Sequence, residues 1–192
     1  FDEFFGIAGS LDMPPYVYVE NDQPVEVPTA WGTQDEFGRA GPRMRSLRAH
    51  NVLGTITDRA VDYIEAHDGE RPFFLYLPLT APHKPTQPHR RFRGKTELGE
   101  YGDFVVQVDG SAGQVLAALD QAGARDETLV VFTSDNGSYM FRYDDPAEPD
   151  HVDDASIQGY RASRHRANGP FRGTKADVWE AGHRVPLLVR WP

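Results

Sequence analysis

Apolar residues occur along the chain in two patterns, as short unbroken runs and at a helical spacing. The unbroken runs cover residues 72–79 and 128–133, and runs of this kind predict strands buried on both faces of a sheet. The helical spacing covers residues 51–67 and 99–122, and a glycine follows each of these predicted helices. A further strand-like run begins at Val185. Since helices and strands alternate in this order, we predict an α/β fold with βαβ units and a mostly parallel sheet.

Two other regions lack a sustained period. Residues 1–45 mix aromatic residues with glycine and proline, and only residues 16–20 have the pattern of a short strand. A stretch of this length is not expected to fold alone, so we predict that it packs against the rest of the chain. Residues 138–169 are charged and poor in aliphatic residues, and a segment of this length without a period is typically functional or disordered.

Polar residues follow both unbroken apolar runs. Asp135 and Asn136 come just after the run at 128–133, and His83 comes just after the run at 72–79. Ligands of open α/β sheets bind beyond the carboxyl ends of the strands, and carboxylate and amide oxygens suit Ca²⁺ or Mg²⁺. These residues alone leave a simple turn open, because Asn136 and Gly137 also form the strongest two-residue hairpin signal.

Composition narrows the class of protein. A chain of 192 residues is long enough for one domain with a substantial core. Its net charge of −9 argues against nucleic acid as the main partner, and no apolar run is long enough to span a membrane. Without cysteine the chain has neither disulfides nor a thiolate metal site. It opens on Phe1 and ends in a strand-like run, so we expect it to be a piece of a larger protein.

Three segments, taken in order, carry a family resemblance. They are residues 73–83, residues 131–137 with Ser-Asp-Asn-Gly, and residues 172–186 with Arg-Gly-Thr-Lys and Glu-Ala-Gly-His-Arg-Val-Pro. Together they resemble the type I, formylglycine-dependent sulfatases, which have an alkaline-phosphatase-like α/β fold with a mostly parallel central sheet flanked by helices. One departure is Ala181, where the family usually has glycine. The resemblance covers residues 1–192 and implies the latter part of a single catalytic domain, with the fold incomplete in this chain.

The resemblance implies an active site and a reaction. Asp135 and Asn136 would hold Ca²⁺, or alternatively Mg²⁺, while His83 and Lys175 would contact the sulfate group of a small-molecule or carbohydrate sulfate ester. The family's nucleophile is a formylglycine made from a Cys or Ser in a Cys/Ser-x-Pro-x-Arg motif, which this chain lacks. We expect it in a segment before Phe1, so the isolated chain should be inactive. Export to the periplasm or medium is common in the family but is not visible in this sequence.

Two other functions stay open at this stage. The first is a phosphomonoesterase or phosphodiesterase of the same superfamily, whose members usually hold two zinc ions. The second is a non-catalytic binding module, in which Asp135 and Asn136 form a structural calcium site or a turn. For individual residues the alternatives are an idle surface histidine at His83 and a solvated side chain at Lys175.

Four further features receive structural rather than catalytic interpretations. Glu180 and Arg184 are expected to pair and brace the loop of Lys175, and His165 is expected on the surface near the rim of the site. The sequon that begins at Asn136 is discounted, because a metal-binding side chain at a strand end would be too enclosed for a glycan. The acidic run at 144–154 is interpreted as a solvated loop. A sheet without its other strands would expose an apolar edge, so we also predict poor solubility for the isolated chain.

Overall fold

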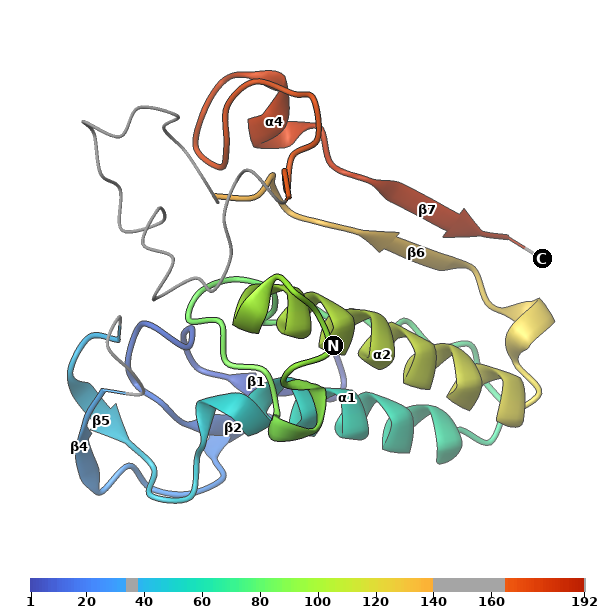
Figure 1. The fold of residues 1–192 in the computed structure, drawn as a ribbon. Coiled ribbons are helices and arrows are strands. Elements are labelled where there is room, and N and C mark those ends of the chain that lie inside the picture. The colour runs from blue at the N-terminus through green and yellow to red at the C-terminus, as the bar shows by residue number, and fades with distance from the viewer. Residues whose placement is uncertain (34–37, 140–164, 192) are drawn as a thin grey trace, which may run out of the picture.

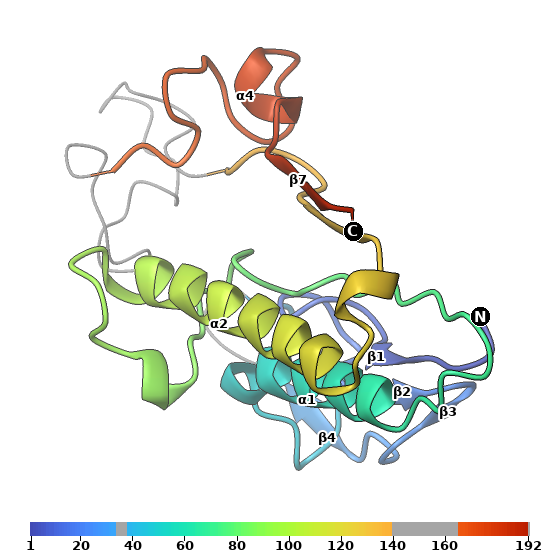
Figure 2. The ribbon, with the colours of Figure 1, turned by 90° about the vertical axis from the view of Figure 1, so that its right-hand side faces the viewer.

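The computed structural model of the protein describes residues 1–33, 38–139 and 165–191. Three parts follow one another along the chain: small antiparallel sheets, a pair of long helices and a two-stranded ladder (Figure 1). Two views at right angles show that the ladder lies beyond α2, while the small sheets lie beside α1 (Figures 1 and 2). No described helix has the length and apolar character needed to cross a membrane.

The two long helices confirm the periodicity of the sequence. Helix α1 spans Ala49–Glu65 and helix α2 spans Gly99–Gln121. They lie side by side and run in the same direction, as two successive contacts show. Thr57 donates a hydrogen bond to Ser111 (2.9 Å), and one to two turns further along both helices Ile64 packs on Ala118 and Leu119. Neighbouring helices that are parallel require the chain to return between them, and an extended segment provides that return (Figure 1).

The first 45 residues are more regular than their sequence predicts. They contain one antiparallel sheet and one antiparallel pair, whose strands are β1 Phe5–Ile7, β2 Tyr18–Glu20 and β3 Gln23–Pro24, then β4 Ala30–Gly32 and β5 Gly41–Arg43. Strand β2 confirms the short strand expected there. The prediction that this region packs against the remainder is also confirmed, because its buried side chains share one core with the start of α1; that core contains Leu11, Val17, Tyr18, Met44, Leu47, Val52 and Ile56.

The first predicted buried strand is extended but forms no ladder among the described residues. Along residues 72–79 the side chains alternate: Phe73 and Leu75 pack against the ends of the helices, whereas Phe74 and Tyr76 are 75% and 67% exposed. The expectation of burial on both faces is therefore wrong for this segment in the described structure. Its helix-facing side packs on the helices; on the other side the Phe1 ring stacks on Phe74, with ring centroids 5.9 Å apart, but both side chains remain largely exposed.

The second predicted strand is present, and its pairing differs from the expectation. Strand β6, Val130–Thr133, pairs with β7, Leu187–Arg190, in an antiparallel register that joins Val130 to Arg190 and Thr133 to Leu187. No parallel strand ladder occurs in the part of the chain that the structure describes. Burial on both faces is again wrong here, because Val131 and Phe132 are 55% and 42% exposed. Local sequence predicts that a segment is a strand, but only the complete set of neighbours decides its pairing and burial.

The direction of the two extended segments agrees with the expected crossover arrangement. Both begin beside the carboxyl-terminal ends of the helices, where Phe73 and Val130 pack on the same cluster around Ile64. Both then run back along the helices and approach each other again at the other end, where the ring centroids of His83 and Tyr139 are 5.7 Å apart. The residues that follow the two segments therefore meet at one end of the molecule.

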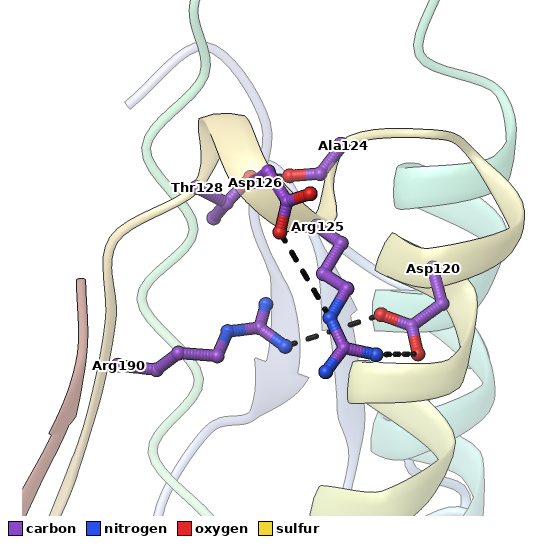
Figure 3. A network of polar contacts seen from close by, with 6 residues as sticks. All are labelled: Asp120, Ala124, Arg125, Asp126, Thr128 and Arg190. Atoms are coloured by element: carbon purple, nitrogen blue, oxygen red, sulfur yellow. Dashed lines mark hydrogen bonds and ion pairs between the residues drawn. The ribbon is translucent and has the colours of Figure 1, made fainter. Parts of the chain in front are cut away.

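A polar network fastens the other end of the ladder to α2 (Figure 3). Asp120, in the last turn of α2, is 3.2 Å from the Arg125 guanidinium and 3.9 Å from that of Arg190 on β7. Arg125 belongs to the short 3-10 helix η2, Arg125–Glu127, which turns the chain from α2 into β6. Asp120 and Arg125 are exposed, and half-buried Arg190 is 3.9 Å from its partner, so we assign the network a role in orientation rather than a large stabilising energy.

Candidate active site at the carboxyl ends of the extended segments

Asp135 and Asn136 lie on a bend directly after β6. The carboxylate Oδ1 of Asp135 accepts the backbone N–H of Asn136 at 2.9 Å and the Ser134 hydroxyl at 3.4 Å, which sets the bend. Asp135 is exposed and Asn136 is half-buried. Because the partner of β6 is β7 rather than the residues after Gly137, the hairpin that the Asn-Gly pair signals is not formed.

The turn that carries Lys175 is built from its own polar residues. The backbone N–H of Thr174 donates to Oδ2 of Asp177 at 2.9 Å, and the N–H of Asp177 returns to the Thr174 carbonyl at 3.0 Å. Ala176 completes the turn in the left-handed region, with φ 73°. The result holds Lys175, which is half-buried, in a short rigid loop before helix α4, Glu180–His183.

Backbone hydrogen bonds join this turn to the bend of Asp135. The N–H of Lys175 donates to the carbonyl of Ser138 at 3.0 Å, and the N–H of Gly137 donates to the carbonyl of Gly182 at 3.0 Å. The loops lie about forty residues apart in sequence but are bonded to each other at two points. The structure therefore brings the predicted metal-binding bend and the predicted lysine loop together.

Asn168 strengthens this hydrogen-bonded connection between the Asp135 bend and the Lys175 loop, which we call the joint. The sequence analysis missed this residue. Its side-chain oxygen accepts the N–H of Ser138 at 2.8 Å, while its side-chain nitrogen donates to the Ser138 carbonyl at 2.9 Å and to the Gly173 carbonyl at 3.4 Å. One amide side chain thus satisfies both backbone groups of Ser138 and holds the lysine loop as well. An Asn before Gly-Pro reads as an ordinary turn signal, so the sequence offered no sign of a contact across thirty residues.

Two glycines allow the loops to approach this closely. A Cβ added to Gly137 would lie 1.6 Å from the carbonyl oxygen of Ala181, and one added to Gly182 would lie 2.1 Å from that of Asp177. Ala181 itself is only 1% exposed, and its backbone N–H donates to Arg172 at 3.0 Å. The alanine that departs from the family pattern is therefore accommodated in the packed interior of the joint.

His83 reaches the same place from the other extended segment. It is half-buried, its Nδ1–H donates to the backbone carbonyl of Lys84 at 2.5 Å, and its ring lies beside that of Tyr139. A carbonyl only accepts hydrogen bonds, so the proton of the neutral ring is on Nδ1 and Nε2 presents a lone pair. Cis peptide bonds precede Pro82 and Pro85 on either side of it.

Two tyrosines form a neutral wall next to His83. Burial raises the pKa of Tyr139, and the neighbouring Tyr101 raises it further. Burial also raises the pKa of Tyr101, against the opposing effect of a hydrogen bond with the Ser138 side chain. Both phenols therefore stay protonated at neutral pH. His165 lies beside Tyr101, with ring centroids 6.2 Å apart, and is half-buried rather than fully on the surface.

The residues predicted to bind metal fit a hard cation only in part. Asp135 offers a carboxylate whose Oδ2 accepts no hydrogen bond from the described residues, and Asn136 offers an amide oxygen. Among the described residues no group of three or more His, Cys, Asp or Glu side chains is placed to hold a metal ion. The donor set suits Ca²⁺ or Mg²⁺, but Ca²⁺ takes about six to eight oxygen ligands, so the two residues account for a minority of the coordination shell.

The four predicted site residues therefore gather in one neighbourhood, centred on Ser138 and Tyr139. No hydrogen bond or ion pair joins the side chains of His83, Asp135, Asn136 and Lys175 directly in the structure as described for 1–33, 38–139 and 165–191. The expected pairing of Glu180 with Arg184 is confirmed by an ion pair of 3.0 Å. The acidic run at 144–154 lies outside the described residues.

Fold and site together define an α/β protein whose polar residues collect beyond the carboxyl ends of two parallel-running segments, an arrangement typical of ligand sites in α/β enzymes. Comparison with known proteins names the family. The Sulfatase family model matches residues 1–192, and the chain therefore belongs to the sulfatase family.

Two curated relatives illustrate the range of similarity. An N-acetylgalactosamine-6-O-sulfatase of Bacteroides thetaiotaomicron is 31% identical over 229 residues, which cover 100% of this chain and 43% of the relative. The steryl-sulfatase of Mus musculus is 43% identical over 122 residues, which cover 64% of this chain and 17% of the relative. The chain thus spans less than half the length of these relatives.

Solved structures agree with the expected architecture. A protein from the metabolism of multiple glycosaminoglycans by Bacteroides thetaiotaomicron matches with a TM-score of 0.81 at 28% identity, covering 100% of this chain and 45% of that one. The PsFucS1 sulfatase of Pseudoalteromonas sp. matches with a TM-score of 0.60 at 25% identity, covering 80% and 28%. The expected fold class, an alkaline-phosphatase-like α/β architecture that is incomplete in this chain, is confirmed.

Proposed function

We propose that the full protein hydrolyses sulfate monoesters and that this chain is the latter part of its single catalytic domain. Membership of the sulfatase family supports the reaction class, in preference to the phosphatase relatives. The main support for placing the active site at this end of the molecule is the joint at Ser138. There the loops of Asp135 and Lys175 are hydrogen-bonded to each other, and the ring of His83 lies beside that of Tyr139.

Asp135 and Asn136 are proposed to hold a divalent cation, with Ca²⁺ preferred and Mg²⁺ as the alternative. Such a cation, when bound, neutralises negative charge on the sulfate and favours ionisation of a nearby hydroxyl. The Oδ2 of Asp135 contributes an anionic oxygen, while its Oδ1 orients the Asn136 backbone by accepting the Asn136 N–H. Asn136 contributes a neutral oxygen, so the pair leaves the site less negative than two carboxylates would, which favours an anionic ester.

Lys175 and His83 are proposed to act on the sulfate group. Lys175 places a positive charge where negative charge accumulates on the sulfonyl oxygens, and its rigid turn holds that charge without reorganisation. The Nδ1–H of His83 donates to the Lys84 carbonyl, so Nε2 is the ring nitrogen that remains to contact the sulfate ester. A neutral ring accepts a hydrogen bond there, and a protonated ring donates one to the departing ester oxygen.

The nucleophile and the substrate lie partly beyond this chain. Residues 1–192 contain no cysteine and no Ser-x-Pro-x-Arg motif, so we place the expected formylglycine in another segment of the full protein. The proposed substrates are sulfated carbohydrates or small sulfate esters, in keeping with relatives named for N-acetylgalactosamine 6-sulfate and steryl sulfate hydrolysis. The isolated chain is expected to be inactive.

The test uses the full-length protein, produced together with a formylglycine-generating enzyme. Hydrolysis of an aryl sulfate and of the matching aryl phosphate is measured with and without a chelator, for the wild type, for Lys175→Ala and for Lys95→Ala. Lys95 is an exposed lysine in the loop before α2 and serves as the matched control. We expect sulfate turnover that the chelator abolishes, that Lys175→Ala lowers by about 10²–10³-fold in kcat/KM, and that Lys95→Ala leaves unchanged.

Two results would contradict this proposal. Hydrolysis of the aryl phosphate alone would instead indicate the function of the phosphatase relatives. Sulfate turnover that survives both the chelator and Lys175→Ala would remove the metal and the lysine from the mechanism and would leave only the family assignment standing.

A further inference from the structure

A pair of histidines stands outside the proposed active site. His50 is in the first turn of α1, His89 precedes the 3-10 helix η1, Arg90–Phe92, and their ring centroids are 6.3 Å apart. The backbone N–H of His89 donates to the side chain of Gln107 on α2 at 2.7 Å, which anchors the loop before η1 to the helix pair. The Nε2 of that glutamine is buried and has no acceptor in the described part of the structure.

Arginines surround the two histidines. Arg48, Arg90 and Arg93 are all exposed, and with His50 and His89 they form what we call the basic cluster. Backbone carbonyls position two of these arginines. Arg48 donates to the carbonyls of Arg45 and Leu47 at 2.6 and 2.9 Å, and Arg93 donates to that of Pro88 at 3.3 Å; these acceptors are uncharged, so the bonds do not offset the positive charges.

Carboxylates neutralise this cluster only weakly. Glu100 is 3.9 Å from Arg93, but both side chains are about half exposed, and an exposed pair at that distance has little energy. Asp103 is buried, and its oxygens accept hydrogen bonds from Thr96 and from the backbone N–H groups of Gly94 and Lys95. No described carboxylate lies within ion-pair distance of Arg48 or Arg90.

The local potential is therefore positive on a chain whose net charge is −9. Burial lowers the pKa of both histidines, and the surrounding arginines lower it further, acting on His50 from Arg93, Arg48 and Arg90. His50 lies in the first turn of α1, whose cap residue Arg48 provides no side-chain hydrogen bond, so the positive end of the helix dipole adds to the effect. A concentration of cations on an acidic protein selects for anions at that point.

We infer that the basic cluster is a subsite that binds anionic groups of a sulfated carbohydrate chain while another residue of the same chain occupies the active site. Guanidinium groups bind sulfate and carboxylate oxygens through paired N–H donors, and neutral histidines at the centre add further hydrogen bonds. His89 is six residues beyond His83, so the two lie within about 21 Å of each other, a distance that an oligosaccharide can bridge. The carbohydrate identity and the link to catalysis rest on the proposed function; the anion binding does not.

Binding and catalysis are measured separately in the full-length protein. The binding probe is a size-fractionated dextran sulfate oligosaccharide, and the catalytic probe is a small aryl sulfate. The variants are Arg90→Ala/Arg93→Ala and, as control, Arg71→Ala, an exposed arginine beyond the carboxyl-terminal end of α1. We expect the double variant to raise the Kd for dextran sulfate at least fivefold and to weaken its salt dependence, with aryl sulfate kcat and KM within twofold of the wild type. The control should match the wild type in every measurement.

Each other outcome has a defined meaning. An unchanged Kd in a double variant with a normal melting temperature overturns the subsite. Single-stranded DNA of equal charge that binds as tightly as dextran sulfate, with the same loss in the double variant, overturns the carbohydrate assignment. If aryl sulfate is not hydrolysed at all but dextran sulfate binding falls in the double variant, the proposed function fails while the anion site stands.

Discussion

The helix pair and the strand ladder were both predicted from patterns of apolar residues, yet they differ sharply in burial. On the helices, Val52, Leu53 and Phe104 are 0%, 1% and 1% exposed. On the ladder, Leu187 and Leu188 are 66% and 57% exposed. The helices find their apolar partners within the described part of the chain, from each other and from the first 45 residues.

Apart from Val130, which packs on the cluster around Ile64, the ladder has no such apolar partner among the described residues. Phe74 and Tyr76 of the extended segment are largely exposed as well, so both extended pieces present uncovered apolar surface. Apolar strands of this kind are stable in water only when another element covers them. We therefore expect additional strands of the full protein to cover the ladder, and we expect residues 1–192 alone to be poorly soluble.

The largest effects on stability are expected when one large aromatic residue is substituted in each region of the full-length protein. Phe104→Ala should reduce the free energy of unfolding by about 3–5 kcal/mol, because it opens a cavity in a closed core. If other strands cover the ladder, Phe132→Ala should cost more than about 2 kcal/mol as well. Denaturant unfolding measures both, with the exposed Trp31→Ala as the control. If Phe132→Ala lowers the free energy of unfolding as little as the control does, no other strand covers the ladder.

The joint between ladder and site should tolerate no added atom, in contrast to the helices. Gly137→Ala should lower stability by about 1–3 kcal/mol and aryl sulfate turnover by a larger factor, because its Cβ would overlap the Ala181 carbonyl and displace Asp135. Gly113→Ala is the matched control, since a Cβ on that helical glycine meets nothing within 4 Å and should stabilise α2 by about 0.5–1 kcal/mol. Equal, mild effects of both substitutions on stability and turnover would show that the joint is loosely packed.

Asn168 tests whether the joint needs its side-chain amide. Asn168→Ala leaves the Ser138 N–H without its acceptor and should cost about 1–3 kcal/mol. Asn168→Asp keeps that acceptor but loses the donor to the Ser138 carbonyl, so it should restore part of the stability. The readout specific to the site is the concentration of Ca²⁺ required for half-maximal turnover, which should rise in Asn168→Ala. Asn51→Ala, at an exposed position of α1, should change neither quantity.

The smallest effect is expected at the surface brace. Arg184→Ala removes an exposed ion pair with Glu180 and a contact with the Phe171 ring at 5.0 Å, so its cost should not exceed about 1 kcal/mol. The cost should fall further in high salt, which screens the ion pair. A thermal melt in low and high salt measures both changes, and a loss of several kcal/mol would show that α4 depends on this pair.

Sequence alone predicted the elements well and their neighbours poorly. The helices were predicted within two residues of their observed bounds at every end, and the family resemblance implied that Asp135 and Lys175 belong to one active site. The parallel pairing of residues 128–133 and their burial on both faces were wrong for the described structure. The roles assigned to His83, Asp135, Asn136 and Lys175 stay predictions until the variants are measured.

The difference has a physical cause. Helical periodicity and the order of short motifs are properties of nearby residues, so the sequence by itself determined the helix pair, the extended segments and the family. The antiparallel partner of β6 lies more than fifty residues away, and Asn168 bonds Ser138 across thirty; nothing local encodes either contact. Only the tertiary structure decided these pairings, the closeness of Gly137 to Ala181, and the gathering of His50 and His89 among arginines, because each depends on how distant segments fill space together.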